Sequence, residues 1–488
     1  MKPVFIFAFL FFFICLFFTP AVFAAPEAAQ PLAVEIEQLG AEALCDLTDG
    51  DYYTFYRSDK PELTVIPEKA ASSLYIVWNQ PAAKYTVFAD EYETVVSDGF
   101  MHKLITFPKP SEKIGIHCDG SGEICDIYLF SDGENLPEYV QNWQEPCKRA
   151  DMLVFSAHAD DELLMFGGTL PYYANELDLR VQVVYMTTHW QEQPRPHEML
   201  DGLWTAGVEN YPVLGIIPDI PYQPIFTLSE AAELYDFEEV ARWFTEQIRR
   251  FRPSVIVTHD LKGEYGHAAH KLAAKIASET AETAGDPEVY PESAEKYGVW
   301  DVPKIYLHFY PENTIEMNWE TPLESYGGIT AREAAALCYN KHKSQHIWGY
   351  SVNYGENWDC RRFGLYRSLV GEDTKADFMD NIIPLPPIED EMPETPITAE
   401  ITAEAEPEET IAEGELTQVA PKTEAAKETA EMTTRRPKQT AAQNEKNVPK
   451  DFGIVILTAV TVIAFVMFII ILSAKGKKRK KQRKKTGK

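Results

Sequence analysis

The sequence predicts a multidomain chain: an antiparallel β-sandwich, then an α/β domain with a mostly parallel sheet, a disordered stalk and one C-terminal transmembrane helix. Three observations predict this order. Short strand-like segments fill the region before Cys147, strands and helices alternate after it, and an uncharged apolar run lies near the C-terminal end. Each change of pattern indicates a domain boundary, because these three structures differ in hydrophobic periodicity.

Residues 1–24 are typical of a secretory signal peptide, with one early lysine, an apolar stretch and small residues before an expected cleavage site at Ala25. An exported chain can form disulfides. Six cysteines remain after cleavage: Cys45, Cys118, Cys125, Cys147, Cys338 and Cys360. These cysteines either form three disulfides or stay as buried free thiols, and the sequence leaves both alternatives open. Cys118 and Cys125 flank a turn-like segment and would face each other across a hairpin.

Residues 30–147 are expected to form the β-sandwich, largely independent of the next domain. The strand-like segments are short, rich in β-branched and aromatic residues, and separated by turn formers: 72–79, 84–90, 103–108, 113–118 and 124–130. The stretch from Leu47 to Ile66 and these strands resemble discoidin-type (coagulation factor 5/8 C-terminal-like) domains. That resemblance implies glycan binding, and a purely structural sandwich is the alternative.

Residues 148–383 alternate between strands and helices. Strands are expected at 151–158, 180–188 and 253–260, and a helix at 236–250 with one apolar stripe. This alternation predicts a mostly parallel sheet with helices on its faces. Ligands of such sheets bind at the carboxyl ends of the strands.

The C-terminal segments predict a membrane anchor. Residues 384–450 are rich in Pro, Glu, Thr and Ala, which is typical of a disordered stalk. Residues 454–474 contain no charge and predict a transmembrane helix, and the tail 475–488 is strongly basic. Because positive charge marks the cytoplasmic flank, we expect a single-pass protein of the cell membrane with exterior-facing N-terminal domains, at a bacterial cell surface. The net charge of −30 excludes nucleic acid as a partner.

Two clusters of metal-ligating residues follow strands of the α/β domain. His158, Asp160 and Asp161 come after the first strand. The second cluster follows another strand and consists of His259, Asp260, Glu264, His267 and His270. If a helix begins near His267, then His267 and His270 share one face. Imidazoles and carboxylates suit Zn²⁺ or another divalent transition metal, and three protein ligands with one open position suit hydrolysis. Spacing alone does not separate the roles of Asp160 and Asp161, and a helix cap beside a surface histidine is the plainer alternative.

These motifs resemble those of the PIG-L/LmbE deacetylase family. The segment AHADDE, Ala157–Glu162, is similar to the family signature (A/P)HPDDE, and GHAAH, Gly266–His270, is similar to its GHxDH element. A weaker likeness is HKSQ, His342–Gln345. The resemblance covers about residues 150–383. It implies a Rossmann-like fold and zinc-dependent hydrolysis of N-acetyl groups from amino-sugar conjugates of the N-acetylglucosamine type.

Carried over to this chain, the resemblance assigns the site residues. Asp160 would be the general base and His267, as an imidazolium, would stabilise the oxyanion. Arg195 matches a position linked to substrate binding, with an ordinary surface arginine as the alternative. The metal ligands would be His158, Asp161 and His270.

Two departures from the family pattern bear on activity. Ala159 stands where proline is usual, and Ala269 stands where aspartate is common between the paired histidines. Three functions therefore stay open: a surface deacetylase, a glycan-binding surface protein with a catalytically silent deacetylase-like domain, and a dinucleotide enzyme. No GxGxxG follows the strand before His158, which argues against the third. The complete set of histidines and aspartates argues against the second.

Overall fold

The computed structural model describes residues 28–383, apart from 41–43, 45, 134, 191, 220–224, 354 and 356. All of them belong to the first of two compact units, Met1–Pro396 and Ile397–Lys488. The expected signal peptide (1–24), stalk (384–450), transmembrane helix (454–474) and basic tail (475–488) lie outside the described residues. Among the helices that are described, none has both the length and the apolar character needed to cross a membrane.

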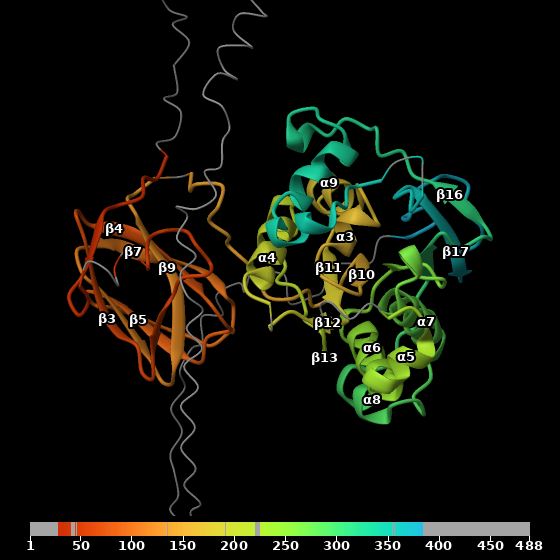
Figure 1. Cartoon of the computed structure of the whole chain (residues 1–488), viewed down its shortest axis with the longest axis horizontal. Coiled ribbons are helices and arrows are strands. Elements are labelled where there is room, and N and C mark those ends of the chain that lie inside the picture. Colours follow the sequence, from red (N-terminus) through yellow and green to blue (C-terminus); the bar gives the residue numbers. More distant parts are fainter. Residues whose placement is uncertain are drawn as a thin grey trace, which may run out of the picture. The chain divides into compact units, whose positions relative to one another are not determined.

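The N-terminal part consists of two antiparallel sheets (Figure 1). One has the order β1 (Val34–Ile36), β3 (Glu62–Pro67), β8 (Ile114–Cys118), β5 (Tyr85–Ala89) and β6 (Tyr92–Val96). The other has the order β2 (Tyr56–Ser58), β9 (Gly122–Phe130), β4 (Ala71–Trp78) and β7 (His102–Ser111). Apolar residues of both sheets, such as Val65 and Ile116 of the first and Ile76 and Ile127 of the second, form one buried cluster. This shared core confirms the predicted antiparallel sandwich, while the resemblance to discoidin-type domains stays a prediction.

The predicted hairpin between Cys118 and Cys125 is wrong. Cys118 ends β8, which lies in the five-stranded sheet, and Cys125 lies on β9 of the four-stranded sheet. The turn between them therefore carries the chain from one sheet to the other instead of pairing its two flanks. Both residues are buried free thiols. Burial raises the pKa of the Cys118 thiol to about 11.

The C-terminal part contains a mixed sheet with the order β11 (Val181–Tyr185), β10 (Met152–Ser156), β14 (Val255–Thr258), β15 (Lys304–His308), β17 (Arg362–Ser368) and β16 (Thr314–Glu316). The first four strands are parallel, and β17 and β16 are antiparallel to their neighbours. The sheet is mostly parallel, as the alternating sequence pattern predicts. A short parallel pair, β12 (Thr187–Thr188) and β13 (Ile217–Pro218), forms a separate two-stranded sheet just after β11.

Helices cover both faces of this sheet. Successive side chains of a strand point to opposite faces, so each face needs its own apolar cover. Met152 and Val154 of β10 belong to one buried cluster, together with residues of α3 (Asp161–Leu164), α4 (Arg195–Thr205) and α9 (Ala331–Tyr339). Leu153 and Phe155 belong to another, with residues of α5 (Leu228–Leu234), α6 (Phe237–Phe251) and α7 (Ala268–Thr283). Figure 1 shows these two helix groups, and α8 (Pro291–Tyr297) beside α6. The short helical turns are η1 (Pro171–Glu176), η2 (Glu264–Gly266), η3 (Glu324–Tyr326) and η4 (Lys343–Trp348).

Helix α4 is tied to the sandwich by buried polar contacts. The His102 Nε2 and His197 Nδ1 atoms lie 2.9 Å apart, and the Tyr52 ring stacks on the His197 ring with centroids 4.2 Å apart. The Tyr52 hydroxyl donates to Asp201, and Phe100 of the sandwich stacks on Tyr211. These contacts join two parts that the sequence pattern treats as independent. The sandwich is therefore part of the surroundings of α4, whose first residue is Arg195.

Because His102 is buried in this contact, we expect the folded protein to lose stability in mild acid. Burial lowers the pKa of His102 to about 3, so the unfolded chain, whose histidines titrate near 6.5, binds its proton first. The stabilising contribution of this residue is complete above pH 6.5 and falls as the pH drops toward 3. Between pH 7.5 and pH 5 we expect a loss of roughly 2 kcal/mol in the free energy of unfolding from His102 alone. Urea denaturation of the parent and of His102→Phe at both pH values measures the difference, and an equal pH dependence in the two proteins would refute it.

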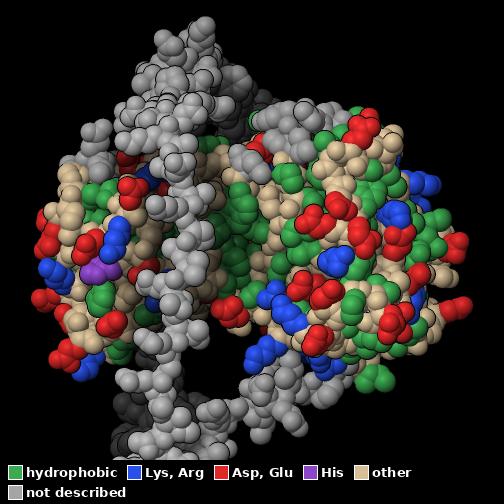
Figure 2. All heavy atoms as spheres, turned by 90° about the horizontal axis from the view of Figure 1, so that it is seen from below, with side chains coloured by type: hydrophobic (Ala, Val, Ile, Leu, Met, Phe, Trp, Pro, Cys, Tyr) green, Lys and Arg blue, Asp and Glu red, His purple; other side chains and the backbone are tan. Residues whose placement is uncertain are grey.

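The described surface carries charges of both signs. Figure 2 shows Lys and Arg side chains scattered among Asp and Glu side chains, with apolar residues between them.

Candidate metal centre

The site lies at the carboxyl end of β10, where the order of the strands reverses. The chain passes from β10 to β11 on one side and later to β14 on the other, so β10 is the switch point at which open α/β sheets bind ligands. His158 follows β10, His259 follows β14 and His308 ends β15. Helix α7 begins directly after His267, as the sequence predicts, and brings His270 to the same edge.

Side chains fix the loop after β10 by accepting its backbone N–H groups. The N–H of Ala157 donates to His259 Nε2 at 2.9 Å, and the N–H of His158 donates to Asp161 Oδ2 at 3.0 Å. The N–H of Asp160 donates to Glu162 at 3.1 Å. Asp160 itself has a φ of 115°, a conformation that costs an L-residue about 1–3 kcal/mol and that is concentrated at functional sites.

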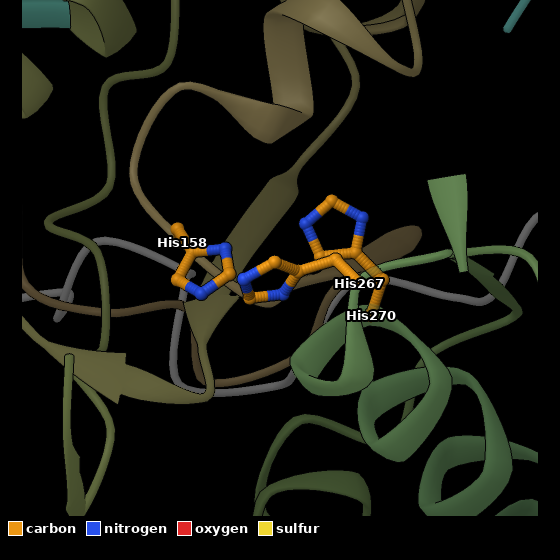
Figure 3. Close-up of side chains that lie close together, drawn as sticks. All are labelled: His158, His267 and His270. Carbon is orange, nitrogen blue, oxygen red and sulfur yellow. The ribbon is translucent and has the colours of Figure 1, made fainter. Parts of the chain in front are cut away.

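His158, Asp161 and His270, the three predicted ligands, converge. Asp161 Oδ2 lies 2.9 Å from His158 Nδ1 and 3.1 Å from His270 Nε2. Figure 3 shows the rings of His158, His267 and His270 grouped together, the first on the loop after a strand and the other two at the start of α7. Ligand atoms of these three histidines lie within 4.8 Å of one another.

This donor set fits a zinc-type cation. Two imidazoles and one carboxylate are the ligands of hydrolytic zinc sites, and all three are enclosed by the fold. Although burial opposes both shifts, contact with His270 and His158 holds the pKa of Asp161 well below its usual range, and Asp161 and Glu264 raise that of His270 to about 10. A metal bound at His270 Nε2 would displace that proton. The assignment of the ligands stays a prediction.

His259 does not fit as a ligand, although it lies in the same group of side chains. Its Nε2 already accepts the Ala157 N–H, and its Nδ1 lies 3.0 Å from Glu264 Oε2. Both ring nitrogens are therefore engaged. The ring holds the loop instead.

Asp160 and Arg195 face each other beside the candidate ligands. Arg195 is buried, and its guanidinium donates to the Ala159 carbonyl at 2.8 Å and to Asp219 at 2.6 Å, with Asp160 Oδ1 at 3.7 Å. The alternative of an ordinary surface arginine is excluded by this burial. Burial, opposed by Arg195, raises the pKa of Asp160 well above its usual value, and a cation bound nearby would lower it.

His267 differs from the expected imidazolium. Its Nδ1 accepts the Ala269 N–H at 3.3 Å at the start of α7, which leaves Nε2 to carry the ring proton. Burial, together with the neighbouring His158 and His270 rings, lowers the pKa of His267 to about 2. Any hydrogen bond from His267 to a substrate would thus come from a neutral ring through Nε2.

The two departures from the family motifs have local explanations. The N–H of Ala159 donates to His189 Nε2 at 2.9 Å, a bond that proline cannot make, so the loop is held by a hydrogen bond instead of a ring. Ala269 is buried in the apolar cluster that contains α6 and α7. An aspartate there would place a carboxylate in that core.

Three polar residues at the site carry no role in the sequence prediction. Asp219 contacts both Arg195 and His189, and Glu264 and His308 contact each other at 2.6 Å. His308 could have been found from its place at the end of a strand-like segment. Asp219 follows a strand of only two residues, which gives almost no sequence signal.

Comparisons with known proteins identify the family. Residues 153–281 match the model of the PIG-L family, described as GlcNAc-PI de-N-acetylase. A 1D-myo-inositol 2-acetamido-2-deoxy-alpha-D-glucopyranoside deacetylase 1 from Catenulispora acidiphila is 29% identical over 194 residues, which are 35% of this chain and 59% of that protein. The deacetylase of the same description from Streptomyces scabiei is 27% identical over 232 residues, 42% of this chain and 71% of that protein.

Among solved structures, the N,N'-diacetylchitobiose deacetylase from Pyrococcus horikoshii aligns with 43% of this chain and 76% of its own, at 18% identity and a TM-score of 0.30. The chain thus spans 59% of the length of the Catenulispora relative. The family match includes all three candidate ligands: His158 in the loop after β10, Asp161 at the start of α3 and His270 on α7. The chain therefore contains a domain of the PIG-L family, over residues 153–281.

Proposed function

We propose that this chain is a metal-dependent hydrolase that removes N-acetyl groups from an amino-sugar conjugate of the N-acetylglucosamine type. The observation that carries the proposal is the convergence of His158, Asp161 and His270 on one another beside Asp160. The deacetylase names of the relatives point to the same substrate class.

The proposed reaction adds water to the acetamide carbonyl and releases acetate and a free amine. When bound by His158, Asp161 and His270, Zn²⁺ or another divalent transition metal would polarise the carbonyl and acidify water. Asp160 accepts the proton of the attacking water and returns it to the leaving amine. His267 donates from Nε2 to the developing oxyanion, and Arg195 holds the carboxylate of Asp160 in place.

Acetate release from a panel of N-acetylated sugars tests this function. The full-length protein is treated with a chelator and assayed with and without added zinc, with Asp160→Asn as the inactive control. We expect zinc-dependent release of one acetate per amine formed. Binding to glycans without any acetate release would refute the hydrolase and would support the alternative, a glycan-binding protein with a silent domain.

We further propose that the chain is anchored in the membrane by residues 454–474, with the described domains on the exterior. The uncharged run and the basic tail after it support this orientation. The stalk, 384–450, would separate the site from the membrane.

Deleting Gly453–Lys488 is expected to release the protein into the medium, because the deletion removes the only apolar run after residue 383. Fractionation of cells that produce the full and the shortened chain measures the release. A deletion of residues 384–450 with the apolar run kept is the matched control, and it should stay with the membrane. If the shortened chain also stays with the membrane, another part of the protein holds it there.

A further inference from the structure

We propose that Glu264 is the positioning residue of the metal centre: it accepts hydrogen bonds from three imidazoles and thereby directs Nε2 of His270 toward the metal. The proposal rests on the metal-dependent function proposed above. It assigns a role to a buried carboxylate that is not among the candidate ligands.

Glu264 lies among three histidines from separate parts of the fold: His259 follows β14, His270 is on α7 and His308 ends β15. Its Oε2 is 2.7 Å from His270 Nδ1 and 3.0 Å from His259 Nδ1, and its Oε1 is 2.6 Å from His308 Nδ1. The N–H of Asp260 also reaches Oε1, at 3.2 Å. An ionised carboxylate has about four acceptor positions, so all four contacts can be satisfied at once. Glu264 is only 1% exposed, so water does not compete for them.

The turn that delivers Glu264 depends on Gly263. Gly263 has a φ of 68°, and a β-carbon at this position would lie 2.4 Å from the His267 carbonyl oxygen. The next three residues form the turn η2 immediately before α7. The backbone is thus shaped to place the carboxylate beneath the histidines of the site.

The hydrogen-bond pattern fixes the tautomer of His259. Its Nε2 accepts the Ala157 N–H, so the ring proton must be on Nδ1, where it is donated to Glu264. Through this ring the carboxylate also holds the loop that carries His158. Two parts of the metal centre therefore depend on one side chain.

The same logic applies to His270. Donation from Nδ1 to Glu264 leaves Nε2 directed to Asp161, the neighbouring candidate ligand, at 3.1 Å. Histidines that bind metals through one nitrogen commonly donate the other N–H to a carboxylate, which fixes the ring and increases its basicity. Glu264 stands in that relation to His270.

His308 is the third partner of the carboxylate. Its Nδ1 lies 2.6 Å from Glu264 Oε1, and its Nε2 faces the Asp359 carbonyl oxygen at 3.0 Å. The His308 ring is therefore held from both sides, and it fixes the Oε1 side of the carboxylate while Oε2 faces His270 and His259.

Zinc affinity is the primary test. Zn²⁺ is titrated into the metal-free full-length protein in competition with a chelating indicator, and no substrate is present. We expect Glu264→Gln to bind zinc about 10- to 100-fold more weakly, the usual effect of losing such a partner of a ligand. Glu233→Gln, which removes the same charge from an exposed position on α5, should bind zinc like the parent.

Glu264→Asp keeps the buried charge and guards against a simple folding failure of the amide variant. Its shorter side chain cannot accept from all three rings together, so it should also bind zinc more weakly. Parent-like affinity in either folded variant would overturn the proposal. Circular dichroism of the metal-free proteins shows which variants are folded.

The hydrogen bond from the His259 Nδ1–H gives a second readout that a merely structural role would not change. In ¹H–¹⁵N spectra of metal-free protein labelled at histidine, we expect a downfield Nδ1–H proton that exchanges slowly with water in the parent, because it is donated to Glu264, and a shifted or fast-exchanging one in Glu264→Asp. An unchanged Nδ1–H signal in that variant would overturn the proposal. If the parent binds zinc in this Glu264-dependent way but releases no acetate from any sugar, only the proposed function fails.

Discussion

Replacing Asp160 by asparagine is expected to lower turnover of an N-acetyl amino sugar by about 100- to 10,000-fold, the usual contribution of a general base. The carboxamide has nearly the same shape but cannot accept a proton. Zinc content should stay near that of the parent, because the candidate ligands are the neighbouring Asp161 and two histidines. In this one variant turnover should thus fall while the metal content stays the same.

The environment of Asp160 supports an effect on chemistry more than on folding. Asp160 is 6% exposed and its Oδ1 lies 3.7 Å from Arg195 Nη2, so its position is set by that guanidinium. An asparagine oxygen can take the same place. We therefore expect the thermal unfolding temperature to change little compared with the change in turnover.

Acetate release and elemental zinc analysis on the same preparations measure both quantities. Asp132→Asn, at an exposed position in the sandwich, is the matched control and should behave like the parent. Loss of zinc from Asp160→Asn together with its retention in Asp161→Asn would mean that the two aspartates have exchanged roles. Full activity in Asp160→Asn would exclude it as the base.

The fold follows from the sequence where periodicity is local. Strands β4, β5, β7, β8 and β9 lie within or over the predicted segments, and α6 covers the helix expected from its apolar stripe. The hairpin at Cys118 failed because two adjacent strands look alike in sequence whether they pair or separate into two sheets. That choice depends on which distant strand each one pairs with: β8 pairs with β5 in one sheet, and β9 pairs with β4 in the other.

The contact between α4 and the sandwich was not foreseeable for a similar reason. His102 and His197 are 95 residues apart in sequence. His102 begins the strand β7, and His197 lies on the helix α4. Nothing in either local pattern indicates that the two rings meet. A polar residue on a buried strand face is the one available signal, and it names no partner.

The sequence predicted only those residues of the candidate site that belong to the two motifs. His158, Asp161 and His270 come together as the motifs indicate, because strand ends and a helix start place them at one edge. Glu264 was visible in the second cluster without a role, since its function depends on three rings supplied by other elements. Asp219 was invisible because a two-residue strand leaves no periodic pattern.

Replacing His270 by alanine is expected to abolish both bound zinc and activity, in contrast to Asp160→Asn. The change removes one of three candidate protein ligands, so the loss of affinity should exceed the roughly 10- to 100-fold that follows from losing an outer hydrogen-bond partner. It also leaves Glu264 with one imidazole fewer in a fully buried site. Asp161→Asn should behave in the same way, because Asp161 Oδ2 contacts both candidate histidine ligands.

Zinc titration of the metal-free protein and acetate release measure the two losses together. His346→Ala, which removes an exposed imidazole from η4, is the matched control and should keep both. If His270→Ala kept parent-like zinc affinity, the metal would have to bind elsewhere. Loss of activity with full zinc content would instead make His270 a partner of the reacting atoms and not a ligand. Asp160→Asn should therefore lose turnover alone, whereas His270→Ala should lose zinc and turnover together. The pair of variants thus separates the residue that acts as the base from a residue that binds the metal.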